Sequence, residues 1–72
     1  MMLPKDLEHE VLVNRFIYYV LDDNIISDQA YDTLEREARA VCPKESPVHG
    51  IGSSLRTSYP QEVANDAMSR VS

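Results

Sequence analysis

Apolar residues recur in this chain at the spacing of an α-helix, and no stretch alternates as a half-buried β-strand would. This pattern predicts an all-α fold. The polar cluster Asp22-Asp23-Asn24 interrupts the helical spacing and is typical of a turn between two helices. With 72 residues the chain is long enough for one small domain. The architecture we expect is a helical hairpin with a long loop and a short third helix.

The first helix is predicted from about Lys5 to Leu21. Pro4 suits its first turn, and the acids that follow favour the positive end of the helix. After the turn, Ile25-Ile26 is interpreted as an apolar plug beneath it. The buried stripe is expected to comprise Leu7, Val11, Ile17 (or Tyr18) and Leu21, widened by Phe16 and Val20.

The second helix is predicted over Asp28 to Val41. Ser27 is a good N-cap for it, and Cys42-Pro43 ends it because the residue before a proline resists helical geometry. The side chains expected to face inward are Tyr31, Leu34, Ala38 and Val41.

Residues 44–59 are predicted to be a loop, since Pro47, Gly50 and Gly52 break any period. Pro60 can open a third helix that reaches about Val71. We expect residues 1–55 to form the helical domain and residues 56–72 to be a weak helix or a mobile tail. The apolar edge of that helix would consist of Val63, Ala67, Met68 and Val71.

The chain carries 7 Lys and Arg against 12 Asp and Glu, for a net charge of -5. Residues 1–37 hold nine acids and three bases, whereas residues 38–72 hold three acids and four bases. This balance argues against direct binding of a phosphate backbone, and it favours a basic protein surface as partner. The single cysteine, Cys42, and the lack of an apolar leader or span predict a cytoplasmic protein with no membrane partner. His9 and His49 are too isolated to predict a metal site.

Several tyrosines and aspartates are expected to lie close together around the turn. Asp28, Tyr31 and Asp32 share one face of the second helix, and Tyr18 lies near the end of the first. Antiparallel packing would bring these groups together as a pocket of tyrosine faces rimmed with carboxylates, which suits a flat cation. It suits a phosphate only if Arg15 or another base joins it. The alternative is structural: tyrosines in the core with wet hydroxyls, and acids that complement the helix dipole.

The run YYVLDDNIISDQAYDTL, residues 18–34, resembles the signature of the N-terminal Ia domain of bacterial NAD-dependent DNA ligases. The run SPVHGIG, residues 46–52, is similar to a second motif of that family. The resemblance implies a helical domain that binds the nicotinamide mononucleotide (NMN) half of NAD. Asn24 and Ala30 depart from the family pattern, which has a proline and an acid there. By position, Tyr18 and Tyr19 would stack and contact phosphate, and Asp28, Tyr31 and Asp32 would surround the nicotinamide.

Beyond about Leu55 the resemblance ends, and the lysine motif of the ligase adenylation domain is not found, so we expect no enzyme activity. In size and acidity the chain resembles bacteriophage proteins that redirect host polymerases. These features predict a monomeric, cofactor-free regulator that binds a large host protein in the bacterial cytoplasm. RNA polymerase is the first choice of partner, with an effect on transcription. The alternative is an NMN- or NAD-binding fragment of a split ligase, or a modulator of the host ligase.

Overall fold

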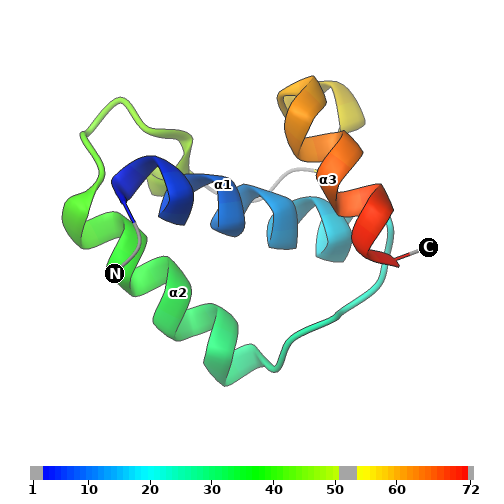
Figure 1. Cartoon of the computed structure of the whole chain (residues 1–72), viewed down its shortest axis with the longest axis horizontal. Coiled ribbons are helices and arrows are strands. Elements are labelled where there is room, and N and C mark those ends of the chain that lie inside the picture. The colour runs from blue at the N-terminus through cyan, green and yellow to red at the C-terminus, as the bar shows by residue number, and fades with distance from the viewer. Residues whose placement is uncertain (1–2, 51–53, 72) are drawn as a thin grey trace.

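The computed structural model describes residues 3–50 and 54–71, and in these ranges it contains helices and turns but no strand (Figure 1). The all-α prediction is therefore confirmed. Gly52, part of the second motif, lies outside the described residues. The elements in chain order are α1 (Pro4–Arg15), the π-helix η1 (Phe16–Val20), α2 (Asp28–Val41), the 3-10 turns η2 (Pro47–His49) and η3 (Arg56–Ser58), and α3 (Gln61–Val71).

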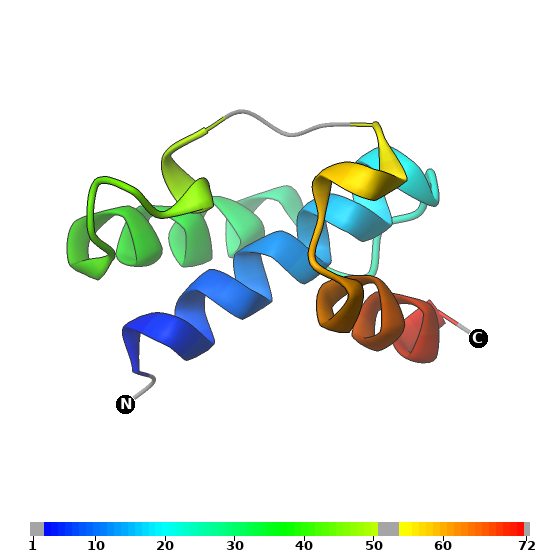
Figure 2. The same cartoon turned by 90° about the horizontal axis from the view of Figure 1, so that it is seen from above.

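The helix α1 lies between α2 and α3 and packs on each with a different half (Figure 2). Its N-terminal half meets the C-terminal half of α2 and the turn η2 in one apolar cluster. Its C-terminal half, with η1, meets α3 in a second cluster. The first cluster consists of Leu7, Val11, Ala38, Cys42 and Val48. The second consists of Leu12, Val13, Phe16, Ile17, Val63, Ala64 and Ala67.

The first predicted helix ends in a turn of π-helix, η1, which is wider than an α-helical turn. The Leu21 N–H donates to the carbonyl of Phe16, five residues back, as in a π-helix. Phe16 and Ile17 are both buried as a result, whereas Tyr18 is exposed. Of the two alternatives for the buried stripe, Ile17 is therefore right and Tyr18 is wrong. The helix ends at Val20, and two residues later Asp22 has a left-handed φ of 53°, a conformation that Asp tolerates better than most residues.

The helix α2 has the predicted bounds. Ser27 caps it as expected, because its Oγ accepts a hydrogen bond from the Ala30 N–H at 3.1 Å. The prediction that Val41 faces inward is wrong: it is 50% exposed and lies at the end of the helix, beyond its contact with α1. The prediction of an apolar plug is wrong for Ile25, whereas Ile26 is half-buried. Ile25 is exposed, because residues 21–27 arc away from α1 toward the distant start of α2 (Figure 1).

The helix α3 contributes to the core. Val63, Ala64 and Ala67 are buried against α1 and η1. At the surface, the Arg70 guanidinium donates to both carboxylate oxygens of Glu10 on α1, at 2.6 and 2.8 Å. Residues 61–71 thus form a helix that is anchored to α1. The domain boundary after residue 55 and the mobility of the tail stay predictions. In the described ranges, no helix has the length and apolar character needed to cross a bilayer.

Two identical substitutions test whether α3 is part of the core. Val63→Ala removes two methyl groups from a side chain that is 2% exposed, so we expect a loss of about 2 kcal/mol in the free energy of unfolding. Val41→Ala, at a half-exposed position, is expected to cost less than about 0.5 kcal/mol. Urea unfolding followed by circular dichroism measures both. Equal losses for the two variants would contradict the packing of α3.

Candidate functional site

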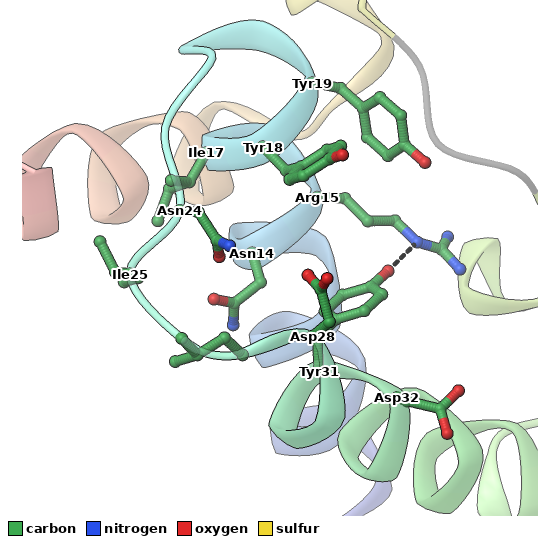
Figure 3. A pocket seen from close by; sticks show the side chains of 11 residues that line it. Asn14, Arg15, Ile17, Tyr18, Tyr19, Asn24, Ile25, Asp28, Tyr31 and Asp32 are labelled. Atoms are coloured by element: carbon green, nitrogen blue, oxygen red, sulfur yellow. Dashed lines mark hydrogen bonds between the residues drawn. The ribbon is translucent and has the colours of Figure 1, made fainter.

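A cavity of about 420 Å³ lies between η1, the link of residues 21–27 and the first turns of α2 (Figure 3). This volume is typical of small-molecule sites in proteins. All five residues that the sequence nominated line it, namely Tyr18, Tyr19, Asp28, Tyr31 and Asp32. The other lining residues are Asn14, Arg15, Ile17, Asn24, Ile25 and Ile26.

The cavity follows from the way in which α1 and α2 pack. Their shared apolar cluster lies at the start of α1 and the end of α2, so the helices diverge toward the turn (Figure 1). The extended link that joins them there leaves its apolar pair, Ile25 and Ile26, on the cavity wall. Ile17, which belongs to the core shared with α3, supplies another apolar part of that wall.

The side chain of Arg15 is 3% exposed and makes a dense set of hydrogen bonds behind the cavity. Its Nε donates to the Tyr31 hydroxyl at 2.9 Å. Its Nη2 donates to Glu35 Oε2 at 2.9 Å and to the carbonyl of Val48 at 2.8 Å. Its Nη1 donates to the carbonyl of Pro47 at 3.0 Å. One guanidinium thereby connects α1, α2 and η2.

Two hydrogen bonds to its hydroxyl hold Tyr31 in place. The oxygen accepts from Arg15 (Figure 3), and the hydroxyl donates to Glu35 Oε2 at 3.0 Å. Burial raises the pKa of Tyr31 to about 12, although the Arg15 guanidinium opposes the shift. The hydroxyl therefore stays neutral at physiological pH, and the ring is held in one place on the cavity wall.

The ion pair between the buried Arg15 and the half-buried Glu35 also keeps its charges at neutral pH. Burial alone would raise the pKa of Glu35, but the hydrogen bonds from Arg15 and Tyr31 outweigh it and leave that pKa lowered. Burial would also lower the pKa of Arg15, and the hydrogen bonds to Glu35 and Tyr31 outweigh it in turn. Glu35 is thus an anion and Arg15 a cation throughout the neutral range.

The remaining nominated residues differ in exposure and direction. Tyr18 and Tyr19 are 52% and 46% exposed, and their rings meet edge to face with centroids 5.0 Å apart. The Asp28 carboxylate is directed from the start of α2 toward Tyr18 (Figure 3). Asp32 points away from Tyr18, and its carboxylate pairs with Arg36 at 2.6 Å. Asp28, by contrast, has no ion pair within residues 3–50 and 54–71, which leaves its charge available to a ligand.

Sequence reasoning missed two polar residues of the cavity, Asn14 and Asn24. Asn14 is buried, and its Nδ2 donates to the carbonyl of Glu10 at 2.8 Å, which fixes the orientation of the amide. Its position four residues before Tyr18 on one helix face could have revealed it. Asn24 sits in the turn, where its backbone N–H is bonded to the Asp23 side chain.

The second motif is used structurally where it is described. Ser46 caps η2 through a hydrogen bond from the Val48 N–H to its Oγ, and its hydroxyl donates to Glu8 at 3.0 Å. Ile51 and Gly52 lie outside the described residues. Cys42 is buried, and its thiol donates to the carbonyl of Pro4. Within the described part of the chain, no group of three His, Cys, Asp or Glu residues is placed to hold a metal ion.

No family model matches this chain, and no solved structure matches it significantly. The likeness to the ligase Ia domain therefore stays a prediction from the motif residues.

Arg15 and Arg39 offer a matched test of the buried network, since both guanidinium groups contact Glu35. Arg15→Met removes the 2.9 Å ion pair of Glu35 and the donors to two carbonyl groups, and we expect it to lower the free energy of unfolding by about 3 kcal/mol. Arg39→Met removes a 3.6 Å contact at the surface and should cost less than about 1 kcal/mol.

Thermal and urea unfolding compare the two variants. Adding Glu35→Gln to Arg15→Met is expected to restore part of the loss, because it removes a half-buried charge whose remaining ion pair, with Arg39, is 3.6 Å long. Equal stabilities for Arg15→Met and Arg39→Met would show that the buried network does not hold the fold.

Proposed function

We propose that this chain is a non-enzymatic binding module whose cavity takes a flat organic cation. The resemblance to the ligase Ia domain indicates the nicotinamide ring of NMN or NAD as the natural ligand, since that ring is a pyridinium. The observation that carries the proposal is the gathering of three tyrosines and the unpaired Asp28 around one cavity of suitable size. Association with a ligase that supplies the catalytic domain follows from the same resemblance.

The lining residues fit such a ring. Tyr31 offers an aromatic surface that is fixed by Arg15 and Glu35, and Tyr18 offers a second, more exposed one. A cation beside an aromatic face gains about 0.5–2 kcal/mol. The Asp28 carboxylate adds an attraction of the right sign, and the Asn14 amide is a partner for the carboxamide of nicotinamide.

The proposal assigns no reaction to the cavity. The described residues that line it comprise tyrosines, isoleucines, asparagines, aspartates and Arg15. Tyr31 is protonated and doubly hydrogen-bonded, and Arg15 is sequestered, so neither is poised as a base or a nucleophile. This set of side chains supports binding and orientation of a ligand.

A pair of small probes tests the preference for a cation. In NMR titrations with 1-methylnicotinamide, a pyridinium cation methylated on the ring nitrogen, and with neutral nicotinamide, we expect saturable shifts at Tyr18, Asp28 and Tyr31. The charged probe should bind about tenfold more tightly, because only it gains from Asp28 and the tyrosine faces. Asp28→Asn should reduce its affinity about tenfold. Asp6→Asn, a matched change at the distant start of α1, should leave the affinity unchanged.

Equal affinities for the two probes would contradict a cation site. The same conclusion would follow if Asp6→Asn weakened binding as much as Asp28→Asn does.

A second candidate function is supported by the charge of the turn. Asp22, Asp23 and Asp28 are all exposed, and none of them has an ion pair in the part of the chain that the structure describes. A concentrated negative surface of this kind fits a basic patch on a large protein. Under this proposal the chain is a phage-encoded regulator in the bacterial cytoplasm, and its partner is host RNA polymerase.

The test is retention of purified bacterial RNA polymerase on the immobilised chain at low salt. Asp22→Asn with Asp23→Asn should abolish retention, and Asn tolerates the left-handed conformation of residue 22. Glu62→Gln with Glu45→Gln, on exposed residues elsewhere, should retain the polymerase and control for net charge. Failure of the wild-type chain to retain polymerase would exclude this candidate.

A further inference from the structure

We infer that the cavity disfavours phosphate and selects pyridinium ligands whose substituent is uncharged, such as nicotinamide riboside, over NMN. The inference rests on the proposed function and limits it. The nicotinamide ring is the part of the ligand that the cavity binds, and the phosphate of NMN weakens that binding. It starts from the one base among the described residues that line the cavity, Arg15.

Arg15 is not available to a phosphate. Its Nε, Nη1 and Nη2 atoms all donate to groups of the protein, and its side chain is 3% exposed. Turning the guanidinium toward a ligand would leave the Glu35 carboxylate without its buried partner and the carbonyls of Pro47 and Val48 without donors. A buried polar group that loses its partner is costly, so the guanidinium stays where it is.

The other charges near the cavity repel an anion. Asp28 has no ion pair among the described residues and is directed toward Tyr18, and the carboxylate of Asp32, paired with Arg36, also lies at the rim (Figure 3). The bases of α2, Arg36 and Arg39, are not among the residues that line the cavity, and Arg36 is paired with Asp32 at 2.6 Å. A phosphate dianion placed beside the tyrosines would therefore face carboxylates without a free cation in the lining.

The N-terminus of α2 is the remaining feature that could attract an anion. The side chain of Ser27 already accepts the Ala30 N–H at 3.1 Å, and Asp28 places its own negative charge in the first turn. The resemblance implies that Tyr18 and Tyr19 contact phosphate, yet their hydroxyls would do so without support from a cation in the cavity. The ring of the ligand therefore fits this chain, and its phosphate does not.

Binding of the ring and the effect of the phosphate are measured with three ligands: 1-methylnicotinamide, nicotinamide riboside and NMN, each titrated at low salt and followed by NMR at Tyr31. We expect nicotinamide riboside to bind about tenfold more tightly than NMN, and added salt to narrow this ratio by screening the carboxylates. NMN affinity equal to or higher than that of the riboside would overturn the inference while leaving the proposed function intact. Failure of all three ligands to bind would overturn both.

A charge variant provides an independent check. Glu35→Gln removes the anion that neutralises Arg15, so NMN affinity should rise several-fold relative to nicotinamide riboside. Glu37→Gln changes the net charge by the same amount at an exposed position of α2 outside the cavity lining, and it should leave the ratio unchanged. An unchanged ratio in Glu35→Gln would show that Arg15 does not determine the selectivity.

Discussion

A buried guanidinium is the constraint on which this small fold depends. Removing a charge from water costs several kcal/mol unless it is paired and hydrogen-bonded. Arg15 meets that requirement by collecting a carboxylate and a hydroxyl from α2 and two carbonyl groups from η2. Because these partners come from separate segments, the orientation of α2 and the position of the Pro47–His49 turn are fixed relative to α1. A chain of 72 residues has little core to spare, so such a network weighs heavily in its stability.

The cavity and the hydrogen bonds of Arg15 both result from the way in which α1 packs against its two neighbours. The N-terminal half of α1 packs against α2, and its C-terminal half packs against α3. The start of α2 therefore lies at a distance from η1 near the turn. Arg15, the last residue of α1, donates to the Tyr31 hydroxyl and so fixes the position of that side chain. The ring of Tyr31 is thereby presented to the cavity while its hydroxyl is withdrawn from it. Binding at this site would use preformed geometry, which lowers the entropy lost when a ligand is held.

The sequence was informative where the determinants are local. Ser27 predicted the start of α2 because N-capping involves only neighbouring residues, and helical spacing placed Asp28, Tyr31 and Asp32 on one face. The rest depends on contacts between distant segments. The π-turn of η1 and the positions of Ile25 and Ile26 follow from where α1 meets its two neighbours. The burial of Arg15 depends on carbonyl groups more than thirty residues away, as the bonds to Pro47 and Val48 show. The assignment to a ligase-like domain remains a prediction from the motifs.

The most direct test of this account is the NMR signal of the Arg15 Nε–H. If the guanidinium is buried against Tyr31, this proton should exchange slowly with water and show a nuclear Overhauser effect to the Tyr31 ring. On addition of 1-methylnicotinamide, the ring signals of Tyr31 should shift while the Arg15 proton stays protected. An Arg15 proton that exchanges as fast as that of the exposed Arg36, with no contact to Tyr31, would contradict the account.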